Sequence, residues 1–389
     1  MRRREFVSLL GGAALTPLTA LPVYAEPPDG CGIPVGREDD WPVAAAGEDK
    51  LVDRAALCKM TDRLASSGAN VHAVLVARGG KLVFERYFSG DEEVPGRFYG
   101  NRMKNVTFDA DKLHNMKSAS KSVGSLALGI AIDRGLIKSV NEPIFSFFPE
   151  LSDLRSPEKD RIRLSHALTM SLGLKWVEAT PATGDYDNDE ARMHMASDQC
   201  RYVLGLPVTA PAGQEFFYNT GALALVSAVI RKATGRPIEE FVRESLFEPM
   251  GITRFEWTTY RGETDIGGGL HLRPRDMAKF GQLVLAGGRW NDRQLVPKAW
   301  IETSTAPKLK ATEGMSYGYL WWLGHSMVNG HQTHWVSASG RGGQYIRIVP
   351  EFDLVFAMTA GYYQDYSPRA FQLQYGVFKD VLQAIPSPG

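Results

Sequence analysis

Strand-like segments lie near both ends of this chain, and most of the sequence between them has helical spacing. Residues 71–77 and 81–88 are rich in apolar and β-branched side chains and flank a Gly-Gly turn, a pattern that predicts a β-hairpin. Segments 344–349 and 353–359 predict two more strands. This order predicts an α+β fold in which both terminal regions build one antiparallel sheet, with helices packed on it and a mostly helical subdomain inserted.

The sequence divides into three predicted segments. Residues 1–25 have a charged start, a short apolar stretch and a small-residue cleavage site, which are the features of an export signal peptide. Residues 26–66 are expected to form an irregular arm followed by a helix. Residues 67–385 are expected to form the main domain, whose helical insertion covers about residues 125–310.

The signal peptide contains Arg3-Arg4 followed by Phe6, which resembles a twin-arginine signal. Such a signal predicts a periplasmic or secreted protein that crosses the membrane already folded. A retained membrane anchor is the alternative, but the apolar stretch is short and is broken by Pro17 and Pro22. No other segment reads as transmembrane, so we expect no stable membrane insertion after signal cleavage.

Charge and cysteine content narrow the expected partners. The 44 Lys and Arg residues balance the 44 Asp and Glu residues, so the chain lacks the basic surplus of a nucleic-acid-binding protein. A small molecule is the expected partner, and the sequence leaves the oligomeric state open. Cys31 and Cys58 are the expected disulfide pair in an oxidising compartment, because both precede the first strand. Three unpaired thiols, including Cys200, are the alternative.

The segment Ser118-Ala119-Ser120-Lys121 opens an apolar helical run. Its spacing places the Ser118 hydroxyl and the Lys121 amine on one face of a first helical turn. A serine hydroxyl becomes nucleophilic when a base takes its proton, and a lysine whose pKa is lowered by burial can be that base. The helix N-terminus also favours a developing oxyanion. The pattern predicts a nucleophile, the alternative being a serine near the N-cap beside a solvated lysine.

Two other segments could complete such a site. Tyr218 lies on a loop just before a helix, from which its phenol could relay a proton to a leaving group. The glycine-rich stretch from Gly340 to Gln344, beside an edge strand, could supply one N–H of an oxyanion hole, with the N–H of Ser118 as the other. A structural aromatic and an ordinary glycine loop are the respective alternatives.

In this order and spacing, the three segments resemble the class C β-lactamase-type serine hydrolases. That family also contains penicillin-binding D,D-peptidases, family VIII-type esterases and 6-aminohexanoate-dimer hydrolases. The matches to its S-x-x-K, tyrosine and K-T-G or H-x-G motifs are Ser118–Lys121, Tyr218-Asn219-Thr220 and Ala338-Ser339-Gly340. The likeness runs from about residue 70 to 382 and implies a β-lactamase/transpeptidase-like fold.

The resemblance also implies roles for the matched residues. Ser118 would be the nucleophile, Lys121 its base, and Tyr218 the group that carries a proton to the leaving group. No metal and no organic cofactor is implied. The oxyanion and substrate-binding positions that the resemblance implies are Arg341, Gly340, Thr220 and Asn219.

The chain departs from the family pattern at two positions. Ala338 stands where many members have a lysine that helps to hold the carboxylate of β-lactams and peptidoglycan stems, so the antibiotic-hydrolysing interpretation is weakened. Thr220 stands where an asparagine is common. The Gly-Gly-Gln ending of the third motif and the pair Trp321-Trp322 are closer to the 6-aminohexanoate-dimer hydrolase branch.

The sequence therefore predicts an exported serine hydrolase that cleaves an ester or linear amide through an acyl-serine intermediate. A β-lactamase or D-alanyl-D-alanine carboxypeptidase is one alternative. A non-catalytic penicillin-binding-like sensor is another, although the intact set of Ser118, Lys121 and Tyr218 argues against it.

Other patterns carry less weight. His331 and His334 could bind a metal, but no third ligand is evident in the sequence. The absence of a Gly-x-Ser-x-Gly motif disfavours an α/β-hydrolase. The acidic run at 185–190 predicts a solvated loop in preference to a cleft mouth that attracts amines.

Overall fold

The computed structural model describes residues 30–39, 41–45, 50–95, 101–178, 188–328, 330–365 and 367–386. The predicted signal peptide at 1–25 lies outside these residues. Within the described ranges, no helix is both long enough and apolar enough to cross a bilayer.

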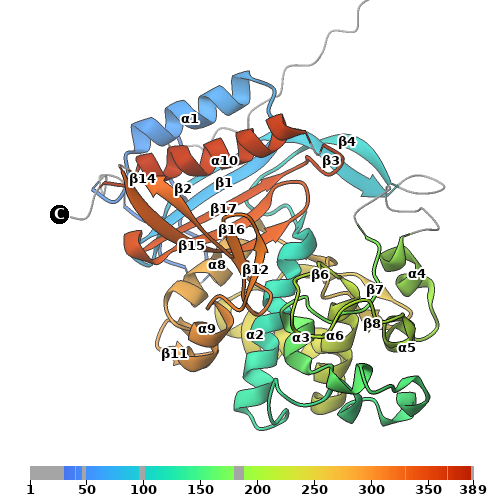
Figure 1. The fold of residues 1–389 in the computed structure, drawn as a ribbon. Helices are drawn as coiled ribbons and strands as arrows, with labels where there is room; N and C mark the ends of the chain where they lie inside the picture. Colours follow the sequence, from blue (N-terminus) through green and yellow to red (C-terminus); the bar gives the residue numbers. More distant parts are fainter. Residues whose placement is uncertain are drawn as a thin grey trace, which may run out of the picture.

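An eight-stranded antiparallel sheet forms the centre of the fold, in the order β12-β13-β14-β15-β16-β17-β1-β2 (Figure 1). The hairpin β1–β2 joins the C-terminal strands because β1 pairs with β17, with Val74 opposite Met358. The α+β prediction with a sheet built from both ends is therefore confirmed. The strands are β1 (Val71–Arg78), β2 (Lys81–Tyr87), β12 (Leu309–Thr312), β13 (Met315–Tyr317), β14 (Trp322–Val328), β15 (His331–Gly340), β16 (Gln344–Val349) and β17 (Leu354–Ala360).

Half of this sheet differs from the sequence-based expectation. Strands β12 to β15 were not anticipated, and β15 lies between β14 and β16, so the stretch before Gly340 is not an edge strand. The inward positions of β15 include buried polar side chains, Thr333 and Ser337. Because those positions are polar, the apolar alternation that identifies a strand in sequence is lost.

Both faces of the sheet are covered, which gives the molecule two apolar cores. Val74 and Val76 of β1 face one core, which they share with helices α1 (Arg54–Ser66) and α10 (Pro368–Gln383). The alternate residue Leu75 faces the other core, on the side of α8 (Pro274–Leu285) and the helical region. Figure 1 shows α1 and α10 on one side of the sheet and the remaining helices on the other.

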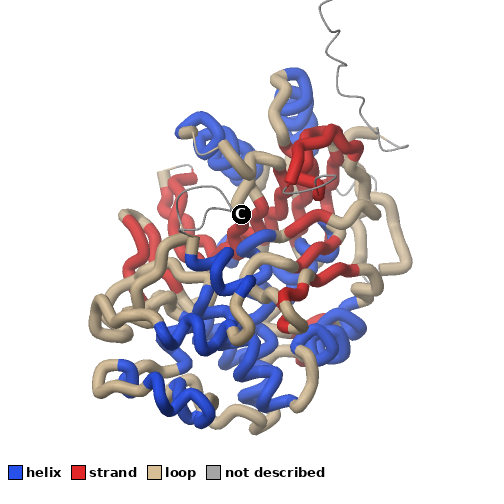
Figure 2. Tube along the Cα trace, turned by 90° about the vertical axis from the view of Figure 1, so that its right-hand side faces the viewer, coloured by secondary structure: helices blue, strands red, loops and turns tan. Residues whose placement is uncertain are grey.

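The polypeptide between β5 and β12 carries most of the helices. In Figure 2 most of the helical segments lie in the lower part of the molecule. These helices are α2 (Ser120–Asp133), α3 (Leu164–Leu168), α4 (Asp189–Met195), α5 (Gln199–Gly205), α6 (Gly221–Thr234), α7 (Ile238–Val242), α8 and α9 (Lys298–Ser304). The small strands are β3 (Ser89–Pro95), β4 (Asn101–Thr107), β5 (His114–Asn115), β6 (Phe255–Trp257), β7 (Thr259–Tyr260), β8 (Glu263–Thr264), β9 (Leu270–Leu272), β10 (Arg289–Trp290) and β11 (Arg293–Gln294).

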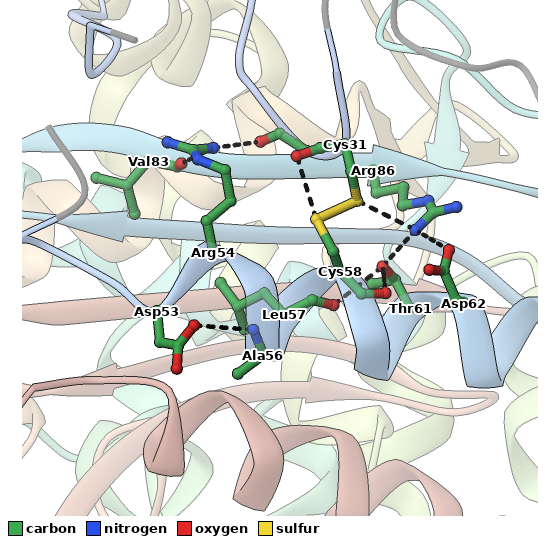
Figure 3. Close-up of a disulfide and its surroundings, with 11 residues drawn as sticks. Cys31, Asp53, Arg54, Ala56, Leu57, Cys58, Thr61, Asp62, Val83 and Arg86 are labelled. Carbon is green, nitrogen blue, oxygen red and sulfur yellow. Dashed lines mark hydrogen bonds and ion pairs between the residues drawn. A yellow bond between two sulfur atoms is a disulfide. The ribbon is translucent and has the colours of Figure 1, made fainter. Parts of the chain in front are cut away.

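A disulfide between Cys31 and Cys58 ties the N-terminal arm to α1, which confirms the expected pairing (Figure 3). Beside it, the Arg86 guanidinium of β2 donates to Thr61 Oγ1 at 2.7 Å and lies 2.7 Å from Asp62 Oδ1. Arg86 therefore joins α1 to the sheet next to the covalent link. Cys200 is a free thiol.

A buried ionic cluster holds the same arm against α8. Arg275 Nε donates to Glu85 Oε2 at 2.7 Å, across the space between α8 and β2. Lys279 Nζ lies 3.2 Å from Asp276 Oδ1 and donates to the backbone carbonyl of Asp39 at 2.5 Å. These groups are almost fully buried. The arm is thus attached both by a covalent bond and by paired charges.

Candidate active site

The turn that presents Ser118 has an unusual backbone. Ser118 lies in a 3₁₀ turn, Lys117–Ala119, immediately before α2. Lys117 has a φ of 48°, in the left-handed region that residues with a side chain rarely adopt. Two hydrogen bonds hold it there: Lys117 N donates to Asn115 Oδ1 at 2.6 Å, and Lys117 Nζ donates to Glu93 Oε2 at 2.8 Å. The chain is therefore constrained on the N-terminal side of the predicted nucleophile.

Lys121 is buried in the first turn of α2 and points toward Ser118. Its Nζ lies 3.0 Å from Ser118 Oγ and donates to the carbonyl of Gly267 at 2.5 Å. Gly267 has little room for a side chain, since a Cβ there would lie 2.6 Å from Thr220 Cγ2. Gly267 was not singled out from the sequence, although the glycine run at 267–269 is a pattern that permits such a close approach. The spacing prediction for Ser118 and Lys121 thus agrees with their observed proximity.

Burial dominates the electrostatics of Lys121. It lowers the pKa of the Lys121 amine below its usual range, while the charges of Glu178, Glu190 and Asp265 oppose that shift. No ion pair to Lys121 is found in the described part of the chain. The lysine therefore has carboxylates around it but none in contact, and it is poised to bind a proton reversibly.

Tyr218 completes a group of three polar side chains that come from separate elements. Lys121 Nζ lies 5.1 Å from the centre of the Tyr218 ring, and Ser118 opposes the rise in the Tyr218 pKa that burial causes. The ring also stacks on Trp322 of β14, with 6.2 Å between centroids. Burial raises the pKa of Tyr218 well above its usual value. Tyr218 is therefore a neutral phenol at physiological pH.

Asn219 and Thr220 contact the protein rather than pointing outward from the site. Asn219 Oδ1 accepts a hydrogen bond from Ala222 N at 3.2 Å, at the start of α6. Thr220 donates through its N–H and its hydroxyl to the two oxygens of Glu178, at 2.7 and 2.6 Å. Trp176 Nε1 donates to the same carboxylate at 2.6 Å. Glu178 fixes the segment that carries Tyr218, and no motif in the sequence indicated it.

The end of β15 lies directly against the turn that carries Ser118. A Cβ on Gly340 would lie 2.2 Å from the carbonyl oxygen of Met116 and 3.1 Å from Lys117 Cβ, so only glycine fits here. Arg341 follows and is partly exposed, and its charge lowers the pKa of Glu190. The structure therefore brings the third predicted segment to the same place as the first two.

The acidic run contributes buried groups to the region, contrary to the expectation of a solvated loop. Residues 185–187 lie outside the described residues. Asp189 is buried and accepts a hydrogen bond from the Tyr202 hydroxyl at 2.5 Å. Burial, with help from the charge of Glu178, raises the pKa of Glu190 to about 7. The start of α4 folds inward because the Asp189 carboxylate finds donors there, the Tyr202 hydroxyl and the Val177 N–H.

The histidines considered earlier for metal binding do not form a cluster. His334 is exposed, and its ring lies 3.1 Å from Glu351. Neither His331 nor His334 belongs to a group of three metal-ligating side chains within the described residues.

Known proteins of one family are similar to this chain. The sequence model of the Beta-lactamase family matches residues 59–368. The 6-aminohexanoate-dimer hydrolase of Paenarthrobacter ureafaciens is 24% identical over 334 residues, which cover 80% of this chain and 78% of that protein. The lovastatin esterase of Penicillium rubens is 25% identical over 46% of this chain and 48% of its own length. A solved structure of a proposed 6-aminohexanoate-dimer hydrolase from Bacillus anthracis superimposes with a TM-score of 0.69, at 21% identity, over 90% of this chain and 87% of that one.

Proposed function

The chain belongs to the β-lactamase family of serine hydrolases, and we propose that it cleaves an ester or linear amide bond through an acyl-serine intermediate on Ser118. The observation that carries this proposal is the buried Lys121 amine, 3.0 Å from Ser118 Oγ and without a carboxylate in contact among the described residues. The names of two relatives, a 6-aminohexanoate-dimer hydrolase and a lovastatin esterase, support amide and ester substrates.

The pKa values of Lys121 and Tyr218 are shifted in opposite directions, which favours Lys121 as the base and Tyr218 as the acid. Lys121, whose pKa is lowered, accepts the proton of Ser118 as the oxygen attacks the substrate carbonyl carbon. Its remaining N–H groups continue to donate to the Gly267 carbonyl. Tyr218, whose pKa is raised, stays protonated, donates its proton to the departing alkoxide or amine and regains one from the Lys121 ammonium, so that both side chains return to their starting states. Two titratable groups in one site are thus adapted to two different steps.

The negative charge on the oxygen of the tetrahedral intermediate is stabilised by backbone N–H donors. The Ser118 N–H lies just before the N-terminus of α2, the helix end at which the dipole favours negative charge. The N–H of Arg341 follows Gly340, which packs against the same turn. After the leaving group departs, water attacks the acyl-serine with Lys121 and Tyr218 again moving protons. The buried Ala338 side chain offers no cation for a substrate carboxylate, which disfavours β-lactams and peptidoglycan stems.

The test is hydrolysis of p-nitrophenyl butyrate and of a linear 6-aminohexanoate dimer by the wild type and by Ser118→Ala. We expect the variant to lose about a thousandfold or more in kcat/KM, because removing a nucleophile abolishes the covalent route. A fluorophosphonate probe should add to Ser118 in the wild type, as detected by intact and peptide mass.

The matched control is Ser125→Ala, seven residues further along the chain in α2. Ser125 Oγ is buried and has no hydrogen-bond partner among the described residues, so its loss should leave both activity and probe labelling intact. Turnover retained in Ser118→Ala, or labelling elsewhere, would refute the assignment. Rapid nitrocefin hydrolysis with no ester turnover would favour the β-lactamase alternative.

A further inference from the structure

Three metal-ligating side chains, two buried histidines and a partly buried glutamate, converge close to the turn that carries Ser118. His72 is on β1, Glu92 on β3 and His114 on β5. His72 Nδ1 lies 2.8 Å from His114 Nε2, and Glu92 Oε2 lies 3.4 and 3.1 Å from these two nitrogens. Ligand atoms bound tetrahedrally to Zn²⁺ at 2.0–2.1 Å are about 3.3 Å apart. The two distances from Glu92 match such an edge, and the 2.8 Å distance between the imidazole nitrogens is shorter than one.

Hydrogen bonds around the cluster fix which ring nitrogens carry protons. Asp91 N donates to Asn70 Oδ1 at 2.7 Å, and Asn70 Nδ2 donates to the Asp91 carbonyl at 2.9 Å, so the orientation of the amide is determined. Asn70 Oδ1 can therefore only accept from His72 Nε2, at 3.1 Å. The carbonyl of Asn115 accepts likewise from His114 Nδ1, also at 3.1 Å.

The consequence is that both inner nitrogens present lone pairs to each other and to a carboxylate. Neutral imidazoles protonated at His72 Nε2 and His114 Nδ1 have no hydrogen on the facing atoms. Three electron-pair donors within 3.4 Å repel unless a cation lies among them. That cation is either a shared proton or a metal ion.

The surroundings resemble an outer coordination shell. Each ligand has a second polar partner: Asn70 for His72, the Asn115 carbonyl for His114, and the Tyr363 hydroxyl, which donates to Glu92 Oε1 at 2.8 Å. The His72 ring stacks on Phe108 at 4.1 Å between centroids. The His72 and His114 rings are almost fully excluded from solvent.

Glycines leave room for the His72 ring. A Cβ on Gly90 would lie 2.6 Å from His72 Cδ2, and one on Gly361 would lie 2.9 Å from His72 Cε1. The ring is therefore held in place by backbone as well as by hydrogen bonds. The local structure is built around a fixed orientation of His72.

We propose that His72, Glu92 and His114 form a binding site for a first-row divalent cation, Zn²⁺ in preference, with water as the fourth ligand. Two imidazole nitrogens and one carboxylate oxygen are donors that Zn²⁺ accepts readily. The role is structural, because the ion would join β1, β3 and β5 just before the chain reaches Ser118. Tyr363 extends this link, since its ring lies 4.7 Å from Lys117 Nζ.

The first experiment uses the full chain without an affinity tag. Protein purified in the absence of chelator should contain one zinc ion per chain by elemental analysis. After chelator dialysis, Co²⁺ should restore one equivalent with the intense visible absorption of a tetrahedral site, and Zn²⁺ should raise the melting temperature. None of these readouts depends on turnover, so the result is independent of the proposed hydrolase activity.

Variants locate the site. Glu92→Gln keeps the side-chain size but removes the anionic ligand, and it should lose the Co²⁺ spectrum and most of the bound zinc. His334→Gln, which removes the exposed histidine beside Glu351, should change neither. Absence of metal and of a Co²⁺ spectrum in the refolded or dialysed wild type would overturn the proposal and leave a shared proton as the cation. Equal binding by Glu92→Gln would overturn it as well.

Discussion

Two lysines of this protein share spacing and burial but have different partners. Lys121 is the second residue of α2 and lies three residues after Ser118, while Lys279 belongs to α8 and lies three residues after Asp276. Both are almost completely buried, and both donate to a backbone carbonyl at 2.5 Å. Lys121 meets a neutral hydroxyl at 3.0 Å, whereas Lys279 meets a carboxylate at 3.2 Å.

The residue three positions before each lysine differs in charge. A neutral residue there allows the buried lysine to be a base, whereas a carboxylate makes it a structural cation. A carboxylate in contact favours the ammonium form and makes an ion pair that is difficult to break once buried. A hydroxyl offers no such compensation, so burial lowers the pKa of Lys121 and leaves its amine able to take a proton. A search for buried lysines alone would therefore select both sites.

The same substitution at both lysines should separate the two roles most strongly. Lys121→Met should reduce kcat/KM by about a thousandfold or more while the free energy of unfolding stays level or rises, because a well-packed apolar side chain replaces a buried amine. Lys279→Met should destabilise the fold by about 3 kcal/mol, because Asp276 loses a buried counter-charge. Ester turnover and urea unfolding measure the two effects.

The control for Lys279→Met uses the second partner of Asp276. Asp276 keeps a hydrogen bond from Arg273 Nε at 2.6 Å in Lys279→Met, which limits the loss of stability. Because Asp276→Asn removes the buried charge that has lost Lys279, the double variant should regain part of that stability. Equal stability of Lys279→Met and wild type would contradict the structural role. Substantial turnover by Lys121→Met would contradict the assignment of the base.

The sequence indicated Ser118 and Lys121 because both belong to one helical turn, where spacing alone places side chains on one face. It also indicated the strands at 71–88 and 344–359, which are apolar on both faces. Strand β15 escaped prediction because Thr333 and Ser337 occupy inward positions. Contacts between distant segments leave no local pattern.

The residues around the site illustrate this limit. Glu178 contacts Thr220 across 42 positions in sequence, and neither residue stands in a spacing that predicts the other. Gly267, whose carbonyl accepts from Lys121, was visible only as part of a glycine run. The cluster of His72, Glu92 and His114 was missed for the same reason, since it joins three separate strands.

The attachment of the arm gives a second, smaller contrast between the two lysines. Lys279 donates to Asp39, eight positions after Cys31, whereas no residue of the arm contacts Lys121 among the described interactions. Replacing Cys31 and Cys58 by serine removes the restraint of a loop with a sequence separation of 27 from the unfolded chain. We expect a loss of about 2–3 kcal/mol in the free energy of unfolding, with unchanged ester turnover at low temperature.

The control for this variant is Cys200→Ala, which removes the free thiol without cutting a cross-link and should cost distinctly less stability. Urea unfolding with and without reductant measures both. If the double serine variant were as stable as the wild type, the disulfide would not constrain the arm. If it lost turnover while still folded, the arm would have to act on the Lys121 site too.

The smallest expected effect concerns the carboxylates around Lys121. The amine is the base only when neutral, so kcat/KM should rise with pH through the lysine pKa, which burial places below the usual range. The negative charge of Glu190 raises that pKa, and Glu190 itself titrates at about 7. Glu190→Gln removes the charge at every pH, so the rising limb should move to lower pH by less than about one unit.

The pH range in which the wild type and Glu190→Gln differ shows whether the charge of Glu190 causes the difference. Below about pH 7 the wild-type Glu190 is protonated and neutral, so the wild type and Glu190→Gln should have converging profiles there and should separate above it. Glu351→Gln, which removes an exposed carboxylate beside His334, should leave the profile unchanged. A limb that moved to higher pH in Glu190→Gln would mean that Glu190 does not act on Lys121 through its charge. The carboxylates around Lys121 act from a distance and adjust its basicity, whereas Lys279 has the Asp276 carboxylate in direct contact.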